Sequence, residues 1–161
     1  MSLLEVLAAA TLMATLMASS MVVLRGSYTA WLTHEADLER LESAYALLRH
    51  VTRDIRQAQA VASISDATSP SGSLELLMAD GSSFHWEHQP LTNEVLFGMT
   101  TPTSLLADNI DEFTLIGYDA DEVATAVIGD IRSVRCEVTV TLPNSASTTR
   151  TVSCTAWLRS W

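Results

Sequence analysis

The sequence predicts an α+β fold in which one long N-terminal helix carries an antiparallel β-sheet. Residues 1–24 form an apolar run whose only charged residue is Glu5. From Leu41 onward, apolar residues recur every three or four positions, which is the spacing of one helix face. Beyond that stripe, short alternating runs separated by turn-forming residues are typical of strands. We therefore expect a helix from near Ser2 to about Ala62, roughly 90 Å long, followed by a sheet.

The apolar run is long enough to cross a bilayer, which takes about 20 residues in a helix. A carboxylate such as Glu5 costs roughly 2.5 to 3.5 kcal/mol in that position, so we expect a positive partner for it. The amine of Met1, one helical turn earlier, could pair with Glu5 within the chain, or with Glu5 of a neighbouring helix during assembly. In the alternative, the run is a signal anchor and Glu5 reaches the lipid headgroups.

The chain divides into an apolar helix over residues 1–26, an amphipathic continuation over 27–62 and a sheet-forming head over 63–161. Tyr28 and Trp31 follow the span as a membrane-interface pair, and Gly26 weakens the helix locally. The second part should bury one stripe of apolar residues against the head, comprising Leu41, Ala44, Leu48, Val51, Ile55, Ala58 and Ala62.

The head should contain at least six strands. Residues 74–78 and 83–88 flank Asp80-Gly81, whose positive φ values suit a tight hairpin turn. Two further runs follow, at residues 94–98 and 112–118, and the last two strands contain the two cysteines. Together they predict a single antiparallel sheet laid against the helix.

The two cysteines fall opposite each other if the last hairpin is centred on Ser145. That register pairs Cys136 with Cys154 and places both sulfurs on the apolar face. A disulfide between them would contribute on the order of 3 kcal/mol and would imply an oxidising compartment. In the alternative, both are reduced thiols that pack as small apolar groups.

The overall charge limits the classes of partner. The 161-residue chain has a formal net charge of −10, and its nine basic residues are all arginine. Such an acidic surface disfavours nucleic acid as a partner. The chain shows no motif for nucleophilic catalysis, phosphate binding or zinc, so we expect neither an enzyme nor a cofactor.

We also expect no metal site. On a strand, His85 and Glu87 share one face while His88 points the other way, so the group reads as a solvated strand edge. Acidic residues cluster between residues 108 and 130, but without the spacing of a calcium-binding loop. A solvated acidic loop is the expected structure there.

The N-terminus resembles the type IV pilin and pseudopilin superfamily, since Met1-Ser2-Leu3-Leu4-Glu5-Val6-Leu7 matches its pattern position by position. Met1 stands where phenylalanine is commoner. The resemblance implies a pilin-like fold, and it implies that a prepilin peptidase exposes Met1 and that its amine is then methylated. It also implies that Glu5 guides docking of subunits, and that the C-terminal region is closed by a disulfide.

The rest of the chain is similar to the J-type minor pseudopilins of type II secretion and to W-type minor pilins, through stretches such as LLRHVTRDIRQAQAV and SLELLMADGSSFHWEH. The expected function is a structural subunit of a type IV pilus-like filament. Its partners would be copies of itself or related pilins and the assembly machinery of the inner membrane. The head would lie in the periplasm or outside the cell. The alternatives are a minor pseudopilin of a secretion or pilus tip complex, and a single-pass membrane-anchored binding module.

Overall fold

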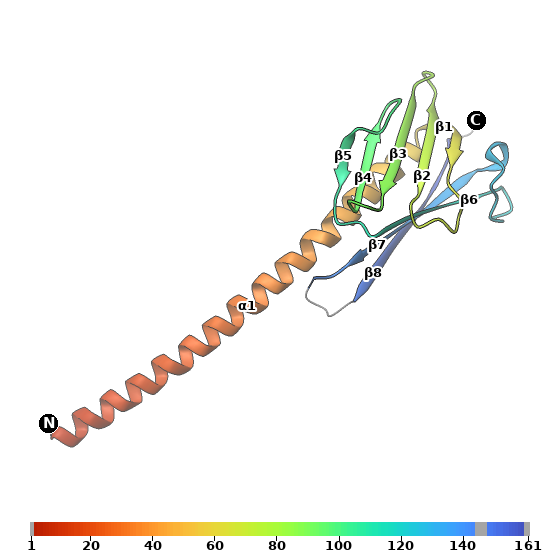
Figure 1. The fold of residues 1–161 in the computed structure, drawn as a ribbon. Coiled ribbons are helices and arrows are strands. Elements are labelled where there is room, and N and C mark those ends of the chain that lie inside the picture. Colours follow the sequence, from red (N-terminus) through yellow and green to blue (C-terminus); the bar gives the residue numbers. More distant parts are fainter. Residues whose placement is uncertain (1, 144–147, 160–161) are drawn as a thin grey trace.

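A long helix dominates the computed structural model, which describes residues 2–143 and 148–159. Helix α1 (Leu3–Ile55) has 53 residues, which corresponds to about 80 Å. Its N-terminal part extends away from the rest of the molecule, and its C-terminal part enters a globular head (Figure 1). The α+β architecture expected from the sequence, with one long N-terminal helix and antiparallel strands, is therefore confirmed.

The helix is shorter than the expected Ser2 to Ala62, because the chain leaves it at Ile55 and begins strand β1 (Ala58–Ile64). Two irregularities in the pairing of β1 break its alternation. As a result, the buried residues Ala58 and Val61 lie three positions apart, which imitates a helical stripe. Ala62 is exposed rather than part of a buried helix face.

The head contains two antiparallel sheets instead of the single expected sheet. The first has the strand order β1-β2-β3-β4-β5, and the second has the order β6-β7-β8. The remaining strands of the first sheet are β2 (Ser73–Met78), β3 (Ser83–Gln89), β4 (Glu94–Gly98) and β5 (Ser104–Ala107). The second sheet comprises β6 (Glu112–Tyr118), β7 (Ser133–Thr141) and β8 (Thr149–Trp157), with a 3₁₀ turn, η1 (Ile128–Asp130), before β7.

The strands predicted from alternation are all present, whereas β1 and β5 were not predicted. The hairpin between β2 and β3 turns as expected, with Gly81 at φ 84°. The Asp80 carboxylate supports this turn by accepting hydrogen bonds from the backbone and the hydroxyl of Ser82, at 2.9 and 2.6 Å. Local turn chemistry therefore accounts for this part of the head.

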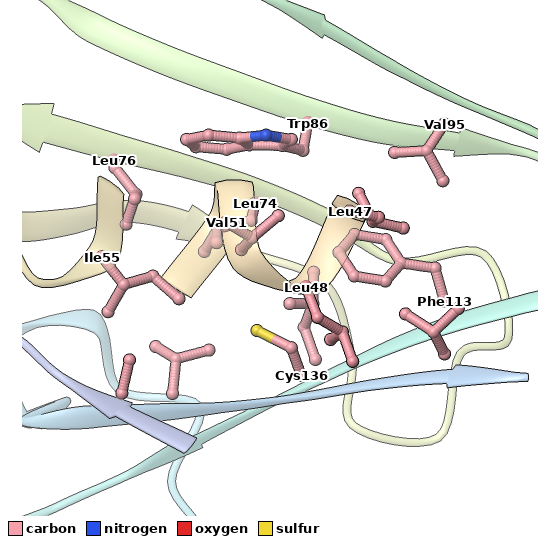
Figure 2. Close-up of a cluster of buried hydrophobic side chains, with 14 of the residues drawn as sticks. Leu47, Leu48, Val51, Ile55, Leu74, Leu76, Trp86, Val95, Phe113 and Cys136 are labelled. Carbon is pink, nitrogen blue, oxygen red and sulfur yellow. The ribbon is translucent and has the colours of Figure 1, made fainter. Parts of the chain in front are cut away.

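The core forms where the two sheets enclose the C-terminal part of α1. Leu47, Val51 and Ile55 of the helix are fully buried. Trp86 and Val95 of the first sheet lie on one side of them, and Phe113 and Cys136 of the second sheet lie on the other side (Figure 2). The helix is covered from two directions, which explains why Leu47 is buried although it lies off the predicted stripe.

The two sheets are joined at Gly72. Its backbone N–H donates to the carbonyl of Phe113 at 2.7 Å, and its own carbonyl accepts from the N–H of His88 at 3.0 Å. A Cβ atom at Gly72 would lie 2.4 Å from the Phe113 carbonyl oxygen. Only glycine allows the backbones to approach this closely.

Candidate functional site

The N-terminal part of α1 is an apolar surface that the head leaves uncovered. Its most hydrophobic 18-residue window has a mean hydropathy of 2.0, is 0% buried, and makes the helix long and apolar enough to cross a membrane. Four hydroxyl groups in this part donate to backbone carbonyls three or four residues earlier, namely those of Thr11, Thr15, Ser19 and Ser20. The outer surface of the helix is therefore apolar even where the sequence is polar.

Glu5 forms a capping box at the start of this helix. Its carboxylate accepts a hydrogen bond from the backbone N–H of Ser2 at 2.9 Å, and the Ser2 hydroxyl accepts one from the N–H of Glu5 at 3.3 Å. This role was not predicted, although the Ser-x-x-Glu spacing before an apolar run is its known signature. Met1, the expected site of processing and methylation, lies outside the described residues.

The junction between the apolar part and the head is a continuous helix. Tyr28 and Trp31 are exposed on α1 with their ring centroids 6.3 Å apart, as suits a pair at a membrane interface. Gly26 lies within the unbroken helix, and a Cβ atom there would have no neighbour within 4 Å. The glycine is therefore not required by packing in the single subunit.

The two cysteines face each other in the predicted register. Cys136 of β7 pairs with Cys154 of β8, and the flanking pairs Val138–Val152 and Val134–Ala156 also agree with the prediction. Both are free thiols in the structure, Cys136 buried and Cys154 partly exposed. The register is thus confirmed, and the disulfide stays a prediction.

The surroundings of the two thiols shift their pKa values in opposite directions. A hydrogen bond from Cys136 lowers the pKa of Cys154 to about 6, helped by Thr52 and the charge of Arg56 and opposed by burial. The Thr52 hydroxyl lies 2.8 Å from the Cys154 sulfur. The same contact between the thiols, together with burial, raises the pKa of Cys136. In the reduced protein, Cys154 is therefore the nucleophilic member of the pair.

The histidines of β3 do not form the expected solvated edge. β3 is the central strand of its sheet, and His88 is buried, with its Nε2 atom 2.8 Å from the carbonyl oxygen of Ile110. Glu87 is exposed on the opposite face. Within residues 2–143 and 148–159, no three His, Cys, Asp or Glu side chains gather as metal ligands.

Comparison with known proteins gives a likeness in structure alone. No protein-family model matches the chain, and no curated protein matches its sequence. Among solved structures, the chain is similar to a type IV-like pilin from Thermus thermophilus, with a TM-score of 0.53 and 10% sequence identity. The match covers 74% of this chain and 97% of that pilin. With its uncovered apolar helix and its antiparallel head, the chain has a pilin-like fold.

Proposed function

We propose that this protein is a structural subunit of a type IV pilus-like filament. The observation that carries the proposal is the fully exposed apolar half of α1, which needs either lipid or other helices around it. A pilin-like head attached to such a helix supports a filament rather than a simple anchor. The subunit would be anchored in the inner membrane before assembly, and its apolar helix would then enter the filament core.

Moving the helix from lipid into a bundle changes its hydrophobic environment little, so close packing must drive assembly. Small residues that allow such packing are frequent in the exposed part, namely Ala8, Ala9, Ala10, Ala14 and Ala18. The hydroxyl groups of Thr11 and Thr15 donate to the helix backbone, so helix packing does not leave these two donors without a hydrogen-bond partner. Helix against helix is therefore a suitable contact for the filament core.

Glu5 would supply the specificity of that contact. In the single subunit its carboxylate already holds the first turn of the helix, and Leu3 and Leu4 beside it are strongly exposed. A carboxylate fixed at the end of an apolar helix can accept the amine of a neighbouring subunit as its helix slides into position. The processed and methylated amine of Met1 is part of this proposal.

Two substitutions separate the two roles of this residue. Glu5→Gln removes the charge but keeps a side chain that can complete the capping box. Ser2→Ala keeps the charge but removes a cap, at a cost of about 1 kcal/mol in helix stability. We expect Glu5→Gln to abolish filaments seen by electron microscopy and Ser2→Ala to retain them, with equal amounts of subunit in the membrane. The reverse pattern would show that capping, not charge pairing, is the function of Glu5.

The rival functions give different results in the same cells. A membrane-anchored binding module needs no charge at Glu5 and forms no filaments, so its ligand binding would not change in Glu5→Gln. A minor pseudopilin or minor pilin would be found by gold labelling at one end of a filament rather than along its length. Mass analysis of the native N-terminus would detect methylated Met1 after prepilin processing, and an unprocessed extension would count against every pilin function.

A further inference from the structure

A groove on the head carries the opposite charge to the rest of the protein. It lies between the last turns of α1 and strand β8, encloses about 500 Å³, and is lined by Leu48, Val152 and Cys154 together with three arginines. These arginines, Arg49, Arg53 and Arg56, are all exposed. None of the lining residues is acidic. The groove is therefore a local basic and apolar surface on a chain of net charge −10.

Among the residues that the structure describes, two of the three arginines have no carboxylate partner. Arg53 forms an ion pair with Asp54 at 2.8 Å, which leaves its side chain 60% exposed. Arg49 and Arg56 form no ion pair with any of the described residues. Since guanidinium groups bind carboxylates in a defined geometry, these two are available to an acidic partner.

An exposed acidic segment lies at the other side of the second sheet. Residues 119–130 follow β6, which is at the opposite edge of the sheet from β8. In this segment Asp121 and Asp130 are exposed and form no ion pair among the described residues. Val123 and Val127 are 59% and 60% exposed beside them. The segment thus offers carboxylates, which the groove lining lacks, and apolar side chains that can pack against Leu48 and Val152 of the groove.

We propose that the groove docks the 119–130 segment of a second copy of this chain, in the filament of the proposed function on which this inference rests. Subunits of charge −10 repel each other when they pack side by side, so a contact that joins unlike charges is needed between them. The groove and the segment lie at different places on one head. Such a contact is head-to-tail and leaves a free groove and a free segment at the ends, so it propagates as a helical array.

A charge swap tests the contact in the full-length chain. Arg49→Glu should reduce filament yield about tenfold or more, because it places a carboxylate opposite the acidic segment. Adding Asp121→Arg or Asp130→Arg to the same chain should restore filaments, since every subunit then carries both reversed partners. Arg150→Glu is the matched control, because it changes the net charge equally at an exposed site of β8 outside the groove.

The controls separate a failed contact from a failed function. If Arg49→Glu lowers the melting temperature of the head, Arg49→Gln should still reduce filament yield, to a smaller extent. The docking contact would be overturned if Arg49→Glu and Arg150→Glu gave equal filament yields. It would also be overturned if neither Asp121→Arg nor Asp130→Arg restored filaments to the Arg49→Glu chain. If Glu5→Gln abolishes filaments in that experiment, the filament function stands without this contact. If Glu5→Gln also assembles normally, the proposed function itself fails.

Discussion

Oxidation of the facing cysteines should stabilise the head by an amount that the structure allows to be worked out. Closing the loop between Cys136 and Cys154 contributes about 3 kcal/mol in the chain-entropy treatment. Against this, the Cys154 sulfur can no longer donate to the Thr52 hydroxyl and becomes a weaker acceptor once it is part of a disulfide, which offsets up to about 1 kcal/mol. The net gain is about 2 kcal/mol or more, which corresponds to a rise of roughly 10 °C or more in melting temperature for a head of this size.

The assay compares full-length protein in detergent after mild oxidation and after reduction. Near-ultraviolet circular dichroism of the fully buried Trp86 reports on unfolding of the head, and a thiol assay counts free cysteines. Cys154→Ser is the control, because it should abolish the difference between the two conditions. The reasoning would be refuted if oxidised protein kept both thiols free, formed only disulfide-linked dimers, or melted at the same temperature as reduced protein.

Three further predictions concern the head. Gly72→Ala should destabilise the head by about 1 to 3 kcal/mol, since the new Cβ would lie 2.4 Å from the Phe113 carbonyl oxygen. Gly129→Ala is the control and should change the melting temperature little, because a Cβ there would have no neighbouring atom within 4 Å. Burial lowers the pKa of His50 below 6.5, so the unfolded chain binds more protons than the folded chain as the pH is lowered through 6.5. The free energy of unfolding should therefore fall on acidification through that pH, and it should fall less in His50→Gln. In reduced protein, alkylation of Cys154 should follow a pKa near 6, and an unfolded sample titrating near the same pH would contradict this.

Two classes of local signal were enough to predict much of the fold. Apolar spacing predicted the helix and the residues Ala44, Leu48, Val51 and Ile55 of its buried face, all of which are buried. Alternation and turn residues predicted six strands and the pairing of Cys136 with Cys154. Such patterns succeed because each depends only on residues close to one another in the chain.

The candidate site was predictable only in part. The lone carboxylate at Glu5 was visible in the sequence, but the capping box with Ser2 was overlooked although its spacing was present. Nothing in the sequence indicated that Arg49 and Arg56 line one groove with Cys154. That neighbourhood exists because β8 folds back onto the end of α1, which brings Thr52 against a residue 102 positions away.

The sequence by itself determined the exposed apolar helix, its terminal carboxylate and the strand hairpins, because helix and strand periodicities and turn chemistry are local properties. The tertiary structure alone decided that β1 is a bulged strand, that the helix is enclosed by two sheets, and that three arginines gather beside the second sheet. Each of these depends on contacts between distant segments. The free energy of these contacts depends on which apolar faces of the helix and the sheets can be buried against each other. The two faces of each contact come from distant parts of the sequence, so no short stretch of sequence contains both.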